Sequence, residues 1–239
     1  MTDHAQPWQD RLRVAGFQPF STVDWPGTIA AAVFLQGCPW RCTYCHNHEL
    51  QARGTPPALR WADVEAKLAK RVGWLDGVVF SGGEPTVDRA LPEAIARVRE
   101  MGFRVGLHTG GAYPDRLAKL LGMLDWVGLD LKTAPEHYAA LTGVPGSGNN
   151  AFHSAHLVAR SGVDYEFRLT YHPELITDDT ARLLVRCAET LGCRKFVIQE
   201  FRPTRNPDAQ GLARAVSIAP ALLDDLRGIL PHIEVRTSS

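Results

Sequence analysis

Residues 29–45, IAAAVFLQGCPWRCTYC, join a short apolar run to a loop that is dense in cysteine. The run 29–35 has the length and composition of a buried β-strand. Cys38, Cys42 and Cys45 follow as soon as this strand ends. In parallel α/β proteins the ligand site forms where loops leave the carboxyl ends of the strands. The cysteine loop therefore marks the expected site if the rest of the chain builds a parallel sheet.

The same alternation of apolar runs and amphipathic stretches continues along the chain, as is typical of βαβ units. Strands are predicted at 29–35, 77–80, 103–107, 126–130, 164–170, 195–200 and 233–237. Helices are predicted at 61–72, 90–101, 113–123, 178–191 and 219–229, where apolar residues recur at three- and four-residue spacing. The stretch 143–152, GVPGSGNNAF, is rich in Gly, Asn and Pro and predicts a loop.

These elements fit one α/β domain with parallel strands, a partial (β/α)6 TIM-like barrel. A chain of 239 residues leaves too little sequence for a conventional eight-unit barrel with ordinary loops. We expect a single domain over 1–239, with its core at about 29–237 and an N-terminal extension at 1–15.

Composition excludes several classes of function. Hydrophobic residues make up 45% of the chain and charged residues 22%, as in ordinary folded domains. The 26 basic residues balance the 26 acidic ones, so the charge excess of a nucleic-acid or membrane-surface binder is absent. Neither a long apolar run nor a secretory signal pattern occurs, and we expect a cytoplasmic protein.

The cysteine array allows two kinds of metal site. Three thiols within eight residues are far more than five cysteines in the chain would place there by chance, and such clusters are more often metal ligands than disulfides. One possibility is a Cys3His zinc site with His46 or His48 as the fourth ligand. The other is an iron–sulfur cluster that three thiolates hold, which leaves one iron free to bind a small molecule. Cys187 and Cys193 lie in or beside a predicted helix and are expected to be buried packing residues.

The C-x3-C-x2-C spacing, with Tyr44 before the last cysteine, resembles the radical S-adenosylmethionine (SAM) superfamily. This resemblance implies a four-iron cluster held by Cys38, Cys42 and Cys45, and Tyr44 packed near the adenine of SAM. It also implies that one electron from the cluster cleaves SAM to a 5′-deoxyadenosyl radical.

A second motif, Ser81-Gly82-Gly83-Glu84-Pro85, follows the next predicted strand. Adjacent glycines at a strand end let the backbone approach a ligand closely. The superfamily carries a GGE-type motif at this place that binds the methionine amino group. The resemblance therefore assigns Gly82, Gly83 and Glu84 to SAM binding.

Within the superfamily the sequence is most similar to activating enzymes of glycyl radical enzymes, especially the longer form of the anaerobic ribonucleoside-triphosphate reductase activating protein. The matching stretches are 16–27, 33–47, 80–85, 130–132, 165–175 and 197–203. Activators of this kind use an aspartate–x–lysine element near SAM and the target glycine. Asp130 and Lys132 are therefore expected to be catalytic, with Lys132 also meeting the SAM carboxylate.

Further polar residues stand at the ends of the later predicted strands. Arg168 lies within a strand, where a buried guanidinium needs an anionic partner, and the resemblance supplies the SAM carboxylate or Glu84. Gln199 and Thr109 are also expected to bind the cofactor, and Arg202 is a weaker candidate.

His108 is a departure from the family pattern. Related activators often have an acidic residue in the place of His108. An imidazole is a poor substitute for a carboxylate at an alkali-cation site. A bound monovalent cation is therefore in doubt.

The sequence thus predicts an activase that abstracts hydrogen from a backbone glycine of a glycyl radical enzyme, most plausibly the anaerobic ribonucleotide reductase. Between Cys45 and Ser81 there is no further cysteine, so one cluster is expected, reduced by a separate donor such as flavodoxin or ferredoxin. Two alternatives stay open: a radical SAM enzyme acting on a small molecule, and a zinc-binding interaction domain without catalysis.

Overall fold

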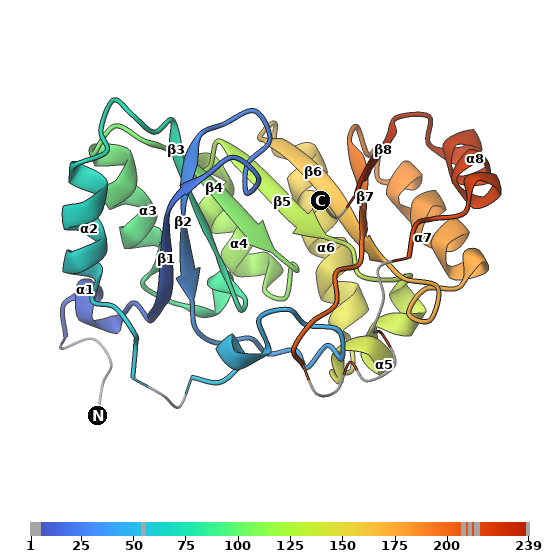
Figure 1. Ribbon diagram of the computed structural model, residues 1–239, viewed down its shortest axis with the longest axis horizontal. Helices are drawn as coiled ribbons and strands as arrows, with labels where there is room; N and C mark the ends of the chain where they lie inside the picture. Colours follow the sequence, from blue (N-terminus) through green and yellow to red (C-terminus); the bar gives the residue numbers. More distant parts are fainter. Residues whose placement is uncertain (1–5, 54–55, 207–208, 210–211, 213–215, 238–239) are drawn as a thin grey trace.

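A computed structural model describes residues 6–53, 56–206, 209, 212 and 216–237 (Figure 1). Its centre is one eight-stranded sheet whose strands follow the order of the sequence. The strands are β1 (Val14–Ser21), β2 (Ala30–Leu35), β3 (Gly77–Gly82), β4 (Arg104–Thr109), β5 (Trp126–Asp130), β6 (Asp164–Tyr171), β7 (Phe196–Glu200) and β8 (Ile233–Arg236). β1 runs antiparallel to β2, and every later pair is parallel.

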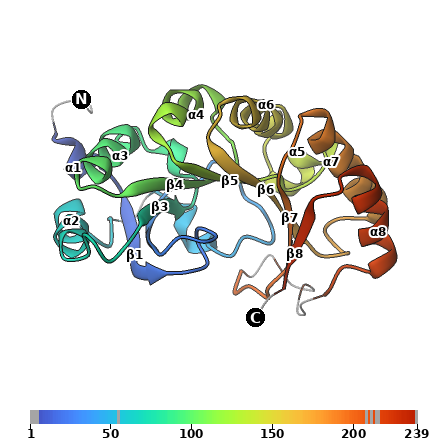
Figure 2. The ribbon, with the colours of Figure 1, turned by 90° about the horizontal axis from the view of Figure 1, so that it is seen from above.

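Helices cover the outer side of the curved sheet, and the sheet does not close on itself (Figure 2). They are α1 (Trp8–Arg11), α2 (Trp61–Ala69), α3 (Leu91–Glu100), α4 (Pro114–Leu120), α6 (Ser147–Arg160), α7 (Asp178–Thr190) and α8 (Pro220–Ile229). The short helix α5 (Tyr138–Thr142) lies instead below α6 at the carboxyl ends of the strands (Figure 1), where the Thr142 carbonyl accepts from the Arg41 amide at 2.8 Å. From β2 to β8 the chain makes six strand–helix units. The prediction of a partial (β/α)6 barrel with parallel strands in a single domain is confirmed.

The main core lies between the sheet and these outer helices. The helix α7 shows how the sequence achieves this, because Ala181, Leu184, Val185 and Ala188 recur at helical spacing and are all fully buried. Burial of one such leucine side chain contributes roughly 1.5–3 kcal/mol. The apolar outer face of the sheet and the apolar stripes of the helices thus hold the barrel in its open shape.

The inner side of the barrel is filled at the amino ends of the strands by Trp25, from the loop between β1 and β2. Its ring stacks on Trp126 with centroids 5.7 Å apart, and the Arg104 guanidinium lies 5.0 Å from the Trp25 ring. Gly77 and Gly106 make room for it, since a Cβ on either would come within about 3 Å of this ring. The free space inside the barrel therefore lies toward the carboxyl ends.

Two predictions of local structure were wrong. The sheet does not begin at residue 29, because β1 precedes it, and α1 and the start of β1 lie within the expected extension 1–15; residues 1–5 of that extension lie outside the described residues. The predicted loop 143–152 contains the first turns of α6. Asn and Gly are weak helix formers, but here tertiary contacts decide: the Asn150 side-chain amide donates to the Ala112 carbonyl at 3.1 Å. A Cβ on Gly148 would also collide with the Pro135 carbonyl oxygen.

This packing predicts opposite effects for two helical glycines. Gly148→Ala should lower the free energy of unfolding despite the better helix propensity of alanine, because its Cβ collides with Pro135. Gly228→Ala in α8, where nothing lies within 4 Å of a Cβ, should raise it by about 0.5–1 kcal/mol. Urea unfolding of both variants measures the difference. Equal effects at the two positions would contradict the close approach of α6.

Candidate functional site

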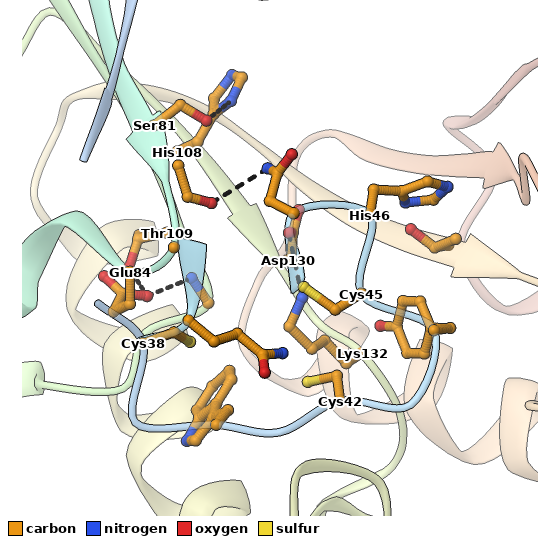
Figure 3. A pocket seen from close by; sticks show the side chains of 18 of the residues that line it. Cys38, Cys42, Cys45, His46, Ser81, Glu84, His108, Thr109, Asp130 and Lys132 are labelled. Atoms are coloured by element: carbon orange, nitrogen blue, oxygen red, sulfur yellow. Dashed lines mark hydrogen bonds and ion pairs between the residues drawn. The ribbon is translucent and has the colours of Figure 1, made fainter. Parts of the chain in front are cut away.

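The loops at the carboxyl ends of β2 to β6 surround a cavity of about 210 Å³ (Figure 3). The loop after β2 supplies the three neighbouring cysteines and Tyr44, and the ends of β3, β4 and β5, the residues just after them, and β6 supply the other predicted residues. The predicted site residues that line it are Cys38, Cys42, Tyr44, Cys45, Gly82, Gly83, Glu84, Thr109, Asp130, Lys132 and Arg168. One cavity therefore gathers residues that are far apart in the sequence.

The cysteine loop is held by backbone hydrogen bonds to its own far end. The Gly37 amide donates to the Leu50 carbonyl at 2.7 Å, and the Cys38 amide donates to the Gln51 carbonyl at 3.1 Å. Figure 3 shows the cysteines around this loop, with Glu84 near Cys38 and Lys132 between Cys42 and Cys45. The loop shape is thus fixed by the chain itself.

The electrostatics of the loop suit a positively charged metal group. Burial, and then the nearby Glu84 carboxylate, raise the pKa of Cys38 to about 12, and burial also raises the pKa of Cys42. Such thiols become thiolates at neutral pH only when a metal cation compensates their charge.

The arrangement of the thiols fits an iron–sulfur cluster better than a zinc ion. Within the described parts of the chain, no three Cys, His, Asp or Glu side chains converge closely enough to share a single metal ion. A closed zinc site needs four such ligands on one ion. In a four-iron cluster each cysteine binds its own iron, so the thiols stand further apart around one space. His46 is exposed and donates from Nε2 to the Arg202 carbonyl at 2.7 Å, so this contact occupies one ring nitrogen.

The glycine pair after β3 allows two backbones to meet. Gly82 has a φ of 116°, and a Cβ there would collide with the Leu35 backbone. A Cβ on Gly83 would collide with the Gly37 carbonyl. The Gly83 amide donates to the Leu35 carbonyl at 2.9 Å, and the Glu84 amide donates to the Gly37 carbonyl at 2.8 Å. The pair therefore joins the end of β3 to the start of the cysteine loop, besides lining the cavity.

The Glu84 carboxylate ties the end of β3 to the end of β4. It is buried and accepts from the Thr86 amide at 3.1 Å and the Thr86 hydroxyl at 2.6 Å. It also accepts from the Thr109 hydroxyl at 2.8 Å and the Gly110 amide at 2.8 Å. Both carboxylate oxygens are therefore already hydrogen-bonded within the protein. Thr109 lies in the cavity wall through this contact.

Asp130, Lys132 and Arg168 form one ion-pair network at the cavity. The Arg168 Nε atom lies 2.8 Å from Asp130 Oδ1, and the Lys132 Nζ atom lies 3.3 Å from Asp130 Oδ2. The two cations hold the pKa of Asp130 at about 2, although burial alone would raise it. The Asp130 carboxylate thus stays ionised and fixes both cations.

Arg168 takes its anionic partner within the protein from Asp130, not from Glu84, which the sequence had offered as one of two candidates. The other candidate, the SAM carboxylate, stays a prediction. Gly128 makes the pairing with Asp130 possible, because a Cβ there would come within 2.7 Å of the guanidinium. Arg168 also donates to the Gly128 carbonyl at 3.3 Å. Glu84 is not the partner because its oxygens already accept bonds from Thr86, Thr109 and Gly110.

Of the remaining predicted residues, Tyr44 lies in the cavity wall, whereas Gln199 and Arg202 do not. Tyr44 is buried in the cavity wall, with Lys132 Nζ 5.8 Å from its ring centroid, and burial raises its pKa. Gln199 lies on β7 and is not among the residues that line the cavity, and neither is Arg202.

His108 uses both ring nitrogens within the protein. Its Nε2 lies 2.7 Å from the Asp24 carbonyl, which only accepts, so Nε2 carries the hydrogen and Nδ1 accepts from the Ser81 hydroxyl at 3.1 Å. Burial and the nearby Arg168 lower the pKa of His108 to about 3. A neutral ring with both nitrogens engaged has no lone pair left for an alkali cation, so the doubt about such an ion remains.

Several residues of the cavity wall were not predicted from the sequence. Trp40 lies against Gly110, and its ring meets Tyr138 edge-on with centroids 5.8 Å apart. Asn47 donates from its side chain to the Gly82 carbonyl at 3.2 Å. Thr170 lies two residues beyond Arg168 on β6 and shares its face. For Thr170 the period of two along a strand was a usable signal, whereas the contacts of Trp40 depend on the tertiary fold.

Comparison with known proteins gives the family. The profile of the radical SAM superfamily matches residues 32–188, which include the cysteine loop and the network around Asp130. The chain belongs to the radical SAM superfamily. Membership makes it an enzyme of the class that uses a four-iron cluster and SAM, and the residues described above fit that cofactor pair.

Several curated relatives are named as activating enzymes. A putative glycyl-radical enzyme activating enzyme of Methanocaldococcus jannaschii is 28% identical over 200 residues, which cover 80% of each chain. A pyruvate formate-lyase-activating enzyme of Clostridium pasteurianum is 31% identical over 55% of this chain and 57% of its own, and that of Streptococcus mutans is 34% identical over 53% of both. The match thus spans most of the first relative and about half of the other two.

Solved structures of other proteins share the fold. A radical SAM methyltransferase from Sphaerobacter thermophilus superposes with a TM-score of 0.64 at 18% identity, over 95% of this chain and 77% of its own. Streptococcus suis SuiB bound to S-adenosylmethionine superposes with a TM-score of 0.61 at 16% identity, over 85% of this chain and 48% of its own.

Within the described residues, no helix is both long and apolar enough to span a membrane.

The cysteine assignment predicts which thiols the iron needs. Cys38→Ala, Cys42→Ala and Cys45→Ala should each abolish iron retention after anaerobic reconstitution, because each removes one of three protein ligands. Cys187→Ala and Cys193→Ala, outside the cavity, should retain iron and sulfide as the wild type does. Iron and sulfide analysis with the absorption spectrum measures this. Iron loss in either of these two control variants would contradict the assignment.

The environment of His108 predicts a pH dependence of stability. The unfolded chain takes up a proton on this histidine below pH 6.5, whereas the folded protein keeps the ring neutral down to about pH 3. Its contribution to the free energy of unfolding should therefore fall as the pH drops below 6.5, by up to about 1.4 kcal/mol per pH unit. Urea unfolding at pH 7.5 and 5.5 should show a larger loss for the wild type than for His108→Gln. An identical loss of unfolding free energy in the wild type and in His108→Gln would mean that the folded protein can hold the protonated ring.

Proposed function

We propose that this radical SAM protein is an activase that generates a glycyl radical on a partner enzyme, the anaerobic ribonucleoside-triphosphate reductase. The main support is that one cavity of an open barrel is lined by the cysteine loop, the glycine pair and the Asp130–Lys132 element. The relative with a glycyl-radical activating name that matches over 80% of both chains supports this proposal.

We propose the following places for the cofactors. Cys38, Cys42 and Cys45 hold one four-iron cluster, and SAM lies between the cysteine loop and the ends of β3 to β6. When bound, the cluster supplies the electron that cleaves SAM reductively and yields a 5′-deoxyadenosyl radical. Tyr44 lies in the wall for the adenine.

The protein's own cations orient the methionine end of SAM in this proposal. Lys132 and Arg168 keep donors that Asp130 does not use, and these donors suit a carboxylate. Glu84 and Thr109 are engaged with each other, so the GGE motif faces SAM mainly with the backbone of Gly82 and Gly83. Asp130 holds the two cations in position and thereby prepares the site before SAM arrives.

The proposed reaction needs two protein partners, an electron donor and the enzyme that carries the target glycine. One electron comes from a separate donor such as flavodoxin or ferredoxin, because the two cysteines outside the loop, Cys187 and Cys193, are too few to hold a second four-iron cluster. A hydrogen atom then passes from the Cα of a partner glycine to the 5′-carbon, and 5′-deoxyadenosine and a glycyl radical result. We place the protein in the cytoplasm, without a nucleic-acid or membrane partner.

Reduced protein, SAM and the anaerobic ribonucleotide reductase of the same organism should give a persistent glycyl radical in the electron paramagnetic resonance spectrum. 5′-Deoxyadenosine should form in step, because each hydrogen abstraction consumes one SAM. A reductase with its target glycine changed to alanine is the matched control and should give no radical. If the wild-type reductase stays radical-free while SAM is cleaved, another glycyl radical enzyme, and then a small-molecule substrate, takes its place as the candidate.

A further inference from the structure

Thr170, Gln199 and Arg236 form a row across the last three strands of the sheet. Thr170 pairs with Gln199 between β6 and β7, and Gln199 pairs with Arg236 between β7 and β8. Paired residues of parallel strands point to the same face. Thr170 lines the cavity, so all three face the inner side of the barrel.

The ion pair of Arg236 agrees with this direction. Arg236 donates from both Nη atoms to the Glu166 carboxylate at 2.6 Å, and Glu166 is fully buried. Glu166, Arg168 and Thr170 alternate along β6 and so share its inner face. A guanidinium on the outer face would not reach this carboxylate.

The row offers hydrogen-bonding groups that the protein leaves unused. In the described part of the chain, the Gln199 amide and the Thr170 hydroxyl make no hydrogen bond to the protein, and both residues are partly exposed. The Arg236 side chain is 30% exposed and keeps its Nε hydrogen beyond the pair with Glu166. These groups form a ladder of donors and acceptors that starts at the cavity.

The charges at the Arg236 end of the row cancel. Arg236 and Lys195 carry the positive charges, and Glu166 and Glu234 carry the negative ones, with Lys195 Nζ 3.8 Å from Glu166 and 3.9 Å from Glu234. An anionic metabolite gains little from such a neutral surface. An uncharged polar ligand that both donates and accepts, such as a peptide backbone, suits it.

The length of the row fits a short extended segment. Two strand spacings of about 4.8 Å place Arg236 about 10 Å from Thr170, which is about three residues of extended chain. In the described residues β8 pairs only with β7, so the row leads from the cavity to an edge of the open barrel.

We propose that this row binds the backbone of the partner segment that carries the target glycine and guides that glycine into the cavity. The Gln199 amide serves one peptide group of the segment, donating to its carbonyl and accepting from its amide, and Thr170 and Arg236 serve the neighbouring peptide groups. This inference rests on the proposed function. It gives Gln199 a role toward the polypeptide rather than toward SAM.

The test uses the reconstituted full-length protein with dithionite, SAM and a nine-residue peptide that copies the glycine loop of the organism's anaerobic ribonucleotide reductase. Gln199→Ala should raise the KM for this peptide three- to tenfold, as expected for one lost hydrogen bond. Gln199→Glu should raise it at least as much, because it removes the amide donor. SAM affinity and 5′-deoxyadenosine formation without peptide should stay at the wild-type level in both. Gln18→Ala, an exposed strand glutamine at the opposite edge of the sheet, is the matched control and should change nothing.

Each other outcome overturns the proposal in a recognisable way. An unchanged KM in both Gln199 variants removes the row from peptide binding, while radical formation by the wild type keeps the proposed function intact. Weaker SAM binding in Gln199→Ala returns this residue to the cofactor. If the wild type cleaves SAM but never transfers hydrogen from the peptide or the whole reductase, the proposed function and this inference fail together.

Discussion

The backbone contact between the end of β3 and the start of the cysteine loop is the constraint on which the site depends. Gly83 and Glu84 donate to the carbonyls of Leu35 and Gly37, and side chains at residues 82 and 83 would push the two backbones apart. This contact places the Glu84 carboxylate where it accepts bonds from the end of β4. A motif that serves a ligand therefore first serves the protein, by setting the distance between neighbouring loops.

The charged side chains around the same cavity are held in fixed orientations. Asp130 is held between two cations, and Glu84 is held by four donors, so the charged side chains are oriented before any ligand binds. Preorganised groups of this kind cost no reorganisation at the moment of reaction. The hydrogen bonds of His108 add to this order, because they hold a neutral ring beside Arg168 where a charged ring would repel it.

The sequence predicted the barrel and most of the cavity because both depend on short-range patterns. Alternating strands and helices fix the carboxyl ends of the strands, and Cys38, Glu84 and Asp130 each lie at or just after such an end. It failed where distant residues decide the outcome. The first turns of α6 contain Gly and Asn because Pro135 and Ala112 lie against them. The ion pair of Arg168 with Asp130 depends on the space that Gly128 leaves on the neighbouring strand. β1 was missed because it is antiparallel and contains Gly16 and Pro19, which are uncommon inside strands.

The Trp25 side chain has a consequence for the order of events. Because it fills the barrel at the amino ends of the strands, the cavity is blind at that end, and ligands enter and leave from the carboxyl side. In the proposed activase, 5′-deoxyadenosine lies beneath the polypeptide that has just given up its hydrogen atom. Exchange of spent for fresh cofactor then has to wait until the partner withdraws its loop. One docking event would therefore yield one radical.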